Sequence, residues 1–121
     1  MPKNDTDAFL PLKTNWFHIL LSLSDGEQHG YGIMQEVLER TSGKVRLWPA
    51  TLYGTLKRLM DEGLIEEWER RGTHEGDDAR RKYYRLTNLG KRVLAAESAR
   101  LRELVRLMEA KGALRKKGYN L

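Results

Sequence analysis

Residues 49–63 read PATLYGTLKRLMDEG, and this segment carries a clear helical pattern. Pro49 favours the first turn of a helix, because its missing N–H would have no partner there and its φ angle is already fixed. Gly63 follows the last turn and is typical of a helix end. The apolar residues recur at i, i+4, i+7 and i+8, which places them on one inward-facing stripe. They are Leu52, Leu56, Leu59 and Met60.

The opposite face of this predicted helix has an unusual composition. A rotation of about 100° per residue brings seven residues onto or beside the outward face. They are Ala50, Thr51, Tyr53, Gly54, Lys57, Arg58 and Asp61. Glycine inside a helix costs about 1 kcal/mol relative to alanine, although solvent would accept almost any better helix former at Gly54. We infer that another molecule approaches the backbone closely there.

Two more helices are predicted before this segment. The first runs from Asn15, a candidate N-cap, to a turn at Ser24-Asp25-Gly26, and it is mostly apolar. The second opens at His29-Gly30-Tyr31-Gly32 and has Gly43 as its C-terminal stop. Its apolar residues again recur at helical spacing. They are Ile33, Met34, Val37 and Leu38.

Two short strands and one long helix are predicted after Gly63. Residues 65–71 and 81–86 have strand character and are joined by the polar residues 72–80, which indicates a hairpin with a long tip. Thr87 is the expected N-cap of a last helix that reaches about residue 110 or 111. The order helix, helix, helix, strand, strand, helix predicts a mainly α-helical winged helix-turn-helix fold with a small β-hairpin.

The composition limits the class of protein. The chain has 121 residues and a mass of 14.1 kDa, enough for one small domain with an appended element. It contains no cysteine, which excludes disulfides, cysteine-bound metals and thiol nucleophiles. An uncharged stretch at residues 14–24 is too short to span a bilayer, so we expect a cytoplasmic protein without membrane contact.

The net charge of +5 does not by itself locate a nucleic-acid-binding face. Residues 1–99 carry 15 basic and 15 acidic residues, whereas residues 100–121 carry 7 basic and 2 acidic ones. The whole excess of positive charge therefore lies at the C-terminal end of the chain.

The outward face of residues 49–63 predicts a contact with double-stranded DNA. A helix in the major groove brings its backbone close to base edges, which accounts for Gly54. Thr51 and Tyr53 then offer hydroxyls to bases or phosphates, and Lys57 and Arg58 supply positive charge to the DNA backbone. An ordinary amphipathic helix that binds no DNA is the alternative for this helix taken alone.

The predicted hairpin strengthens the DNA interpretation. Its tip carries acidic residues that would repel phosphates, Glu75, Asp77 and Asp78, but basic residues follow at once. The predicted DNA-binding residues are therefore Ala50, Thr51, Tyr53, Gly54, Lys57, Arg58, Arg80, Arg81 and Lys82.

The last helix carries two apolar sets, and one helix cannot bury both alone. Leu89, Val93, Ala96 and Leu107 form the set expected to pack on the chain's own domain. The other set has seven-residue spacing and is left for a second copy in a two-fold dimer. It consists of Leu94, Leu101 and Met108, with Leu104 and Val105 between them. Glu97 and Arg100 interrupt this seam, which favours a short helical contact over a long coiled coil.

These elements divide the chain into four expected parts. Residues 1–13 form an N-terminal arm, and residues 14–87 form a winged-helix DNA-binding domain. Residues 88–111 form a dimerisation helix, and residues 112–121 form a basic tail.

An ordered set of short motifs spanning roughly residues 16–92 resembles the PadR family of bacterial transcriptional regulators. The motifs are Gly30-Tyr31-Gly32-Ile33; Pro49-Ala50-Thr51-Leu52-Tyr53 with Leu56, Arg58 and Leu59; Asp61-Glu62-Gly63-Leu64-Ile65; and Arg81-Lys82-Tyr83-Tyr84-Arg85-Leu86-Thr87 with Gly90. The resemblance implies a homodimeric repressor that binds a palindromic operator, often beside its own gene. It also implies that a small-molecule effector or another signal changes the affinity for DNA.

The single C-terminal helix resembles the short subfamily, in which some members hold planar drugs between stacked tryptophans. This chain departs from that pattern, because residues 89–118 contain no aromatic residue. Trp16 is the one candidate for lining a ligand cavity, while Trp48 and Trp68 are interpreted as packing residues.

Two other function classes were considered. An enzyme is disfavoured because His18, His29 and His74 lack metal-ligand spacing and no phosphate-binding loop or nucleophile motif is present. No catalytic residue, metal site or cofactor is therefore predicted. A protein–protein adaptor that uses the winged-helix scaffold without binding DNA specifically remains the alternative.

Overall fold

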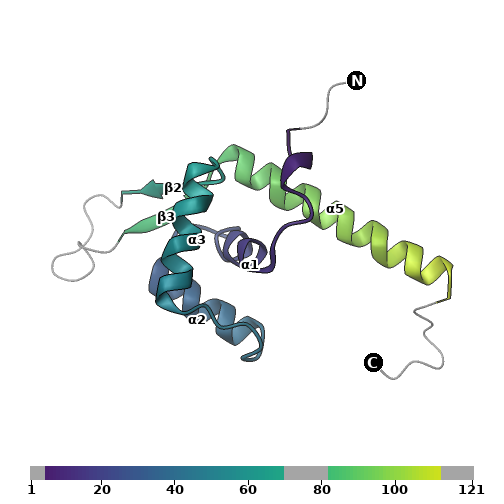
Figure 1. Cartoon of the computed structure of the whole chain (residues 1–121), viewed down its shortest axis with the longest axis horizontal. Helices are drawn as coiled ribbons and strands as arrows, with labels where there is room; N and C mark the ends of the chain where they lie inside the picture. Colours follow the sequence, from purple (N-terminus) through teal and green to yellow (C-terminus); the bar gives the residue numbers. More distant parts are fainter. Residues whose placement is uncertain (1–4, 70–81, 113–121) are drawn as a thin grey trace.

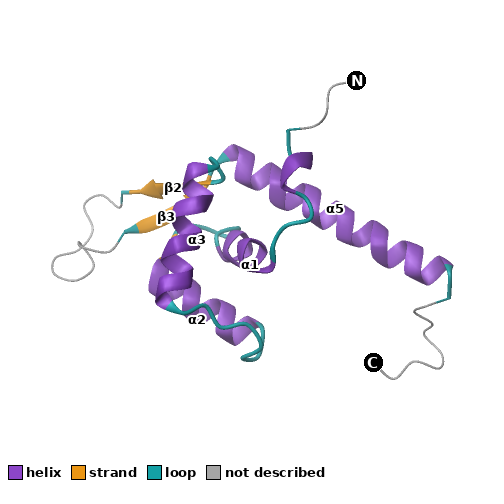
Figure 2. Ribbon diagram, in the orientation of Figure 1, coloured by secondary structure: helices purple, strands orange, loops and turns teal. Residues whose placement is uncertain are grey.

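The computed structural model describes residues 5–69 and 82–112 and confirms a mainly helical chain with a small antiparallel sheet (Figures 1 and 2). Its elements are η1 (Asp7–Phe9), α1 (Thr14–Ser22), β1 (Gln28–His29), α2 (Gly30–Arg40), α3 (Pro49–Asp61), β2 (Ile65–Trp68), β3 (Tyr83–Leu86) and α5 (Asn88–Ala110). In Figure 1, α3 and the β2–β3 hairpin lie on one side of the molecule, and α5 reaches away on the other.

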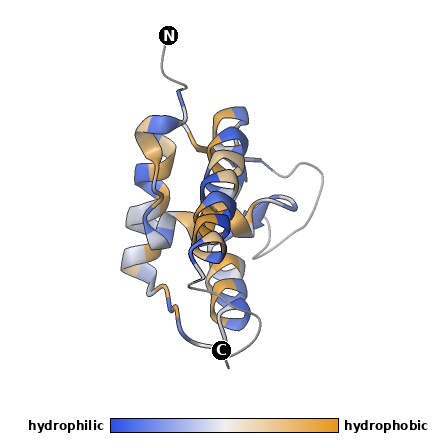
Figure 3. Cartoon of the chain, turned by 90° about the vertical axis from the view of Figure 1, so that its right-hand side faces the viewer, coloured by the Kyte–Doolittle hydropathy of each residue, from blue (hydrophilic) through white to orange (hydrophobic). Residues whose placement is uncertain are grey.

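The predicted apolar stripe of α3 is the centre of the core. Leu52, Leu56 and Leu59 are each at most 1% exposed, and Met60 packs against them from the edge. They meet buried residues of α1 and α2, including Ile19 and Ile33. The prediction that this stripe faces inward is confirmed. Figure 3 shows that hydrophobic and hydrophilic residues alternate along the helices.

The sheet has a strand that the sequence did not reveal. Its order is β1–β3–β2 and both pairings are antiparallel, with Ile65 opposite Leu86 and His29 opposite Tyr83. β1 has only two residues, too few for an alternating pattern to be visible. The described strands β2 and β3 are shorter than the predicted 65–71 and 81–86, and the predicted hairpin tip lies outside the described residues.

The helix starts are set partly by caps that the sequence predicted. Thr87 caps α5: its Oγ1 accepts the N–H of Gly90 at 3.0 Å and donates to the carbonyl of Gly63 at 2.6 Å. The prediction of Asn15 as the cap of α1 was wrong, because α1 begins at Thr14 and Lys13 occupies the N-cap position without a side-chain bond.

The N-terminal segment lies against α5 and anchors it to the domain. Leu12 is buried, and its N–H donates to Glu97 Oε2 at 3.3 Å. Glu97 is only 3% exposed, and Arg100 donates to both of its carboxylate oxygens at 2.7 and 2.9 Å. Nearer the start of α5, Arg92 pairs with Asp5. Glu97 therefore lies buried within its own chain.

The two apolar sets of α5 are divided by position along the helix. Val93 is fully buried, and Leu89 and Leu94 pack against the core. From Leu101 onward every residue of α5 is exposed. The prediction that Leu107 packs on its own domain was therefore wrong, because Leu107 is 45% exposed and lies beyond the reach of the core.

The buried carboxylate of Glu97 gives a stability prediction. Glu97→Ala leaves the Leu12 N–H and the Arg100 guanidinium without their acceptor, so we expect a loss of about 1–3 kcal/mol in the free energy of unfolding. Chemical denaturation at fixed protein concentration measures it. Glu103→Ala is the matched control, because Glu103 makes the same bidentate pair with Arg106 on an exposed part of α5 and should leave stability unchanged. Equal effects of the two substitutions would contradict the anchoring role of Glu97.

The same group has a defined pH dependence. The hydrogen bonds from Arg100 hold the pKa of Glu97 below its ordinary value. A carboxyl whose pKa is lowered by folding stabilises the protein above its unfolded-state pKa, and this contribution is lost as the pH falls through the lowered value. The stability difference between the wild type and Glu97→Ala should therefore be constant near neutral pH and shrink in acid.

Candidate nucleic-acid interface

The structure brings the six predicted DNA-binding residues of α3 onto one exposed side of that helix. Tyr53 is 50% exposed, and the Lys57 side chain is 74% exposed. The whole set is exposed: Ala50, Thr51, Tyr53, Gly54, Lys57 and Arg58. Because the buried stripe occupies the other side, this face is available to an outside molecule.

Tyr53 is held at one edge of this face by the start of α2. A Cβ added at Gly30 would lie 2.6 Å from the Tyr53 hydroxyl oxygen, so the ring lies directly over the Gly30 backbone. Behind it, burial raises the pKa of Tyr84 in β3, with further contributions from Glu67 and Tyr53, and Tyr84 stays neutral. Tyr53 is therefore held by the start of α2, with its hydroxyl end beside Gly30 and half of the residue exposed.

The cations of the face have only weak partners. Lys57 Nζ lies 3.4 Å from Asp61 Oδ2, in a pair that is exposed on both sides and is easily exchanged for another anion. Lys82, directly before β3, is exposed, and its Nζ lies 3.7 Å from Glu67 Oε2. The predicted Arg80 and Arg81 lie outside the described residues, as do the acidic residues of the hairpin tip.

Gly54 is not required by the packing of this chain. A Cβ added there would meet no heavy atom within 4 Å, and the residue has an ordinary helical conformation. Neither crowding nor backbone strain explains the glycine within the described part of the chain. The open surface over Gly54 is consistent with close approach by an outside molecule.

Two exposed aromatic residues beside this face were not predicted as functional. Trp48, the N-cap of α3, is 61% exposed, and Tyr31 in the first turn of α2 is 58% exposed. The interpretation of Trp48 as a packing residue was therefore wrong. The sequence held no signal for this exposure, whereas the structure shows the guanidinium carbon of Arg46 4.8 Å from the centre of the Trp48 ring.

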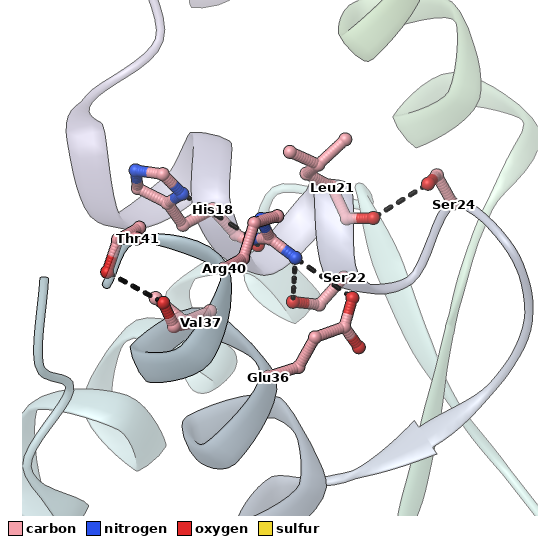
Figure 4. A network of polar contacts seen from close by, with 8 residues as sticks. All are labelled: His18, Leu21, Ser22, Ser24, Glu36, Val37, Arg40 and Thr41. Atoms are coloured by element: carbon pink, nitrogen blue, oxygen red, sulfur yellow. Dashed lines mark hydrogen bonds and ion pairs between the residues drawn. The ribbon is translucent and has the colours of Figure 1, made fainter. Parts of the chain in front are cut away.

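A polar network joins α1 to the C-terminal end of α2 (Figure 4). Arg40 donates to the carbonyl of His18 at 3.0 Å, to the buried Ser22 hydroxyl at 3.3 Å and to Glu36 at 2.9 Å. Partial burial, and then the charge of Arg40, lowers the pKa of His18. This network supports a structural role for His18.

His29 also has a structural role, because its Nδ1 accepts the N–H of Gly32 and caps α2. His74 lies outside the described residues. In the part of the chain that the structure describes, no three histidine or acidic residues gather as metal ligands. No helix there is long and apolar enough to cross a membrane.

A mostly apolar groove of about 630 Å³ lies between α1 and α5, and Leu86 at the end of β3 also lines it. Phe17 and Leu21 line it from α1, and Leu94, Leu101 and Val105 line it from α5. Trp16, the candidate for a ligand cavity, is not among the lining residues but packs against the core.

Comparison with known proteins establishes the family. The model of the transcriptional regulator PadR-like family matches residues 19–96, which include α2, α3, the described strands and the first part of α5. The chain belongs to the PadR-like family of transcriptional regulators. Membership confirms the resemblance seen in the sequence, and it confirms that the chain is not an enzyme.

Individual relatives agree with this membership. The chain is 36% identical over 89 residues to the transcriptional regulator Rv3488 of Mycobacterium tuberculosis, covering 74% of this chain and 77% of that protein. A PadR family transcription regulator from Clostridium difficile R20291 has a solved structure that is similar with a TM-score of 0.64 and 31% identity, covering 78% of this chain and 96% of that one.

A PadR structure from Bacillus subtilis was solved in complex with operator DNA. It is similar with a TM-score of 0.59 and 32% identity, covering 71% of this chain and 46% of that one. The present chain thus matches less than half of the Bacillus subtilis protein.

The open surface at Gly54 predicts a gain in stability on substitution. Gly54→Ala adds a methyl group into empty space in an α-helix, so we expect the free energy of unfolding to rise by about 1 kcal/mol. Gly63→Ala is the matched control: its site is equally open, but its φ of +79° is strained for any residue with a Cβ, so stability should fall. A loss of stability in Gly54→Ala would mean that the fold itself needs the glycine.

Proposed function

We propose that this protein is a dimeric repressor that binds a palindromic operator and is released from it by a small-molecule effector or another signal. The observation that carries the proposal is the exposed face of α3, with its hydroxyls, cations and bare backbone at Gly54. The Bacillus subtilis relative, solved in complex with operator DNA, supports DNA as the partner.

In this proposal α3 enters the major groove. Gly54 lets the groove wall approach the helix, while Thr51 and Tyr53 reach base edges or phosphates. Lys57 and Arg58 on α3, and Arg80, Arg81 and Lys82 on the hairpin, contact the phosphate backbone. The Lys57–Asp61 pair exchanges its carboxylate for a phosphate at little cost, because both groups are already in solvent.

The exposed half of α5 supports a two-fold dimer. Leu101, Leu104, Val105 and Met108 are between 38% and 46% exposed and lie along one broad side of the helix. They continue the apolar lining of the groove between α1 and α5, where Leu94 lies. We propose that α5 of a second copy covers this surface, because exposed apolar residues gathered on one side mark an association site.

In this proposal an effector changes DNA binding by changing the contact between the two copies of α5. Two recognition helices bind one palindrome only when they are about one DNA turn apart, roughly 34–36 Å. Since α5 sets the separation of the two α3 helices, a ligand or signal that changes the α5 contact changes the affinity for the operator. The chain lacks the tryptophan that would stack a planar drug on α5, so drug stacking is not part of the proposal.

Titration of the purified protein against the DNA upstream of its own gene tests the proposal. It is carried out at two salt concentrations and with unrelated competitor DNA. Binding that persists with competitor supports a sequence-specific regulator. Binding that disappears with salt and competitor, at this promoter and across a genomic library, would favour the protein–protein adaptor.

Substitutions on α3 should separate DNA binding from dimer formation. Tyr53→Ala and Lys57→Ala should each weaken operator binding and leave the dimer intact, because both residues lie on the exposed face of α3 and neither lines the groove beside α5. Lys57→Ala should also lower the slope of log K against log salt by about 0.9, the value for one lost phosphate contact. Lys111→Ala at the end of α5 is the charge-matched control. Unchanged DNA affinity in both α3 variants would defeat this assignment.

A charge placed on the exposed side of α5 should prevent dimerisation. Leu101→Glu puts a carboxylate into the proposed apolar contact, and we expect monomers in sedimentation and weaker operator binding. Ala99→Glu is the control, since Ala99 is exposed on the opposite side of α5 and its substitution should leave the dimer intact. An intact Leu101→Glu dimer would refute the assignment of this surface.

A further inference from the structure

The segment that leads into α3 carries two large side chains on its outer side. Val45 packs against the core and Leu47 is 2% exposed, whereas Arg46 and Trp48 are exposed. Such alternation is expected of extended backbone, where residues i and i+2 point the same way. The Arg46 guanidinium accordingly lies over the Trp48 ring, 4.8 Å from its centre.

Hydrogen bonds hold the backbone in place on both sides of Arg46 and Trp48. Thr41 Oγ1 accepts the N–H of Val45 at 3.0 Å and donates to the carbonyl of Val37 at 2.8 Å, which fastens the turn after α2. At the other end, the carbonyl of Trp48 accepts the N–H of Leu52 at 2.8 Å in the first turn of α3. The backbone that carries the two side chains is therefore fixed at the N-terminus of α3, and the contact between guanidinium and ring exists before any partner binds.

The chain's own packing does not account for the pair. Trp48 is more exposed than any other large hydrophobic residue in the described part of the chain. Within residues 5–69 and 82–112, Arg46 makes no ion pair and no hydrogen bond. The Trp48 ring covers the guanidinium on one side, and no other described residue uses its N–H donors.

We propose that Arg46 reads a guanine in each half of the operator and that Trp48 is a positioning residue that fixes the guanidinium plane. The inference rests on the proposed DNA-binding function. The N-terminal end of a recognition helix contacts base edges in the major groove, and Trp48 directly precedes that end. A guanidinium donates two parallel hydrogen bonds to guanine O6 and N7, which lie in one plane.

The fixed plane favours a base edge over a phosphate. A phosphate accepts hydrogen bonds from many directions, and a flexible lysine satisfies it without stacking. Lys44 is exposed two residues before Arg46 and supplies that kind of contact. An oriented guanidinium gains most where the two acceptors themselves have one orientation, as O6 and N7 of guanine do in the groove.

In vitro selection from DNA duplexes with a random core of about 30 base pairs, roughly three helical turns, tests the proposal. The full chain is compared with Arg46→Lys, which keeps the charge, and with Trp48→Ala. Lys13→Ala is the matched control, because it removes a cation stacked on Trp16 at 5.2 Å, away from α3. Thermal unfolding first verifies that each variant is folded.

We expect the wild type to select a palindrome with a guanine at one fixed position in each half. Measured on that sequence, the preference for guanine over adenine at that position should fall at least about 10-fold in Arg46→Lys, and other positions should keep their preferences. Trp48→Ala should reduce the preference at the same position, an effect that general destabilisation does not produce. Lys13→Ala should select as the wild type does.

Three outcomes would overturn the inference. An unchanged base preference in Arg46→Lys, with specific binding by the wild type, rejects it and leaves the proposed function standing. A uniform loss of affinity over all sequences assigns Arg46 to a phosphate instead. The absence of sequence-specific binding by the wild type rejects both the inference and the proposed function.

Discussion

The rotation of α3 about its own axis is the constraint on which the rest of the structure depends. Leu52, Leu56 and Leu59 are almost fully buried, and burying a leucine stabilises a fold by roughly 1.5–3 kcal/mol. Turning the helix by one residue would expose part of this stripe, so the core holds α3 in a single orientation. The residues between the leucines then have to face outward. The proposed DNA-binding face therefore inherits its rigidity from hydrophobic packing behind it.

The two halves of α5 have different surroundings: the first half packs on the chain's own domain, and the second half extends beyond it. Its first half is anchored by the buried Val93 and by Glu97, whose carboxylate accepts hydrogen bonds from Arg100 and from the N-terminal segment at Leu12. Its second half extends beyond the core and keeps apolar residues such as Leu101 in solvent. A rigid first half transmits the position of the second half to the domain that carries α3. The dimer contact that we propose for α5 would therefore also set where the two copies of α3 lie.

Several features escaped sequence analysis for identifiable physical reasons. The cap of α1 depends on where the N-terminal segment enters after packing on α5, and for this reason Asn15 was misplaced. Trp48 was taken for a packing residue because hydrophobicity does not say which side of an extended segment faces the core. The two-residue strand β1 is too short to have a pattern, and it forms only because β3 offers it a pairing edge.

Periodicity, caps and turn residues by themselves determined the order of the helices and of strands β2 and β3, the buried side of α3, and Thr87 as the N-cap of α5. These depend on neighbours within about one helical turn, so the local sequence contains the necessary information. Tertiary structure alone decided that Glu97 would be buried and paired, and that Arg46 would stack on an exposed Trp48. Each of these depends on which distant surface, if any, covers the side chain. Such long-range burial is a property of the packed molecule, and no short segment encodes it.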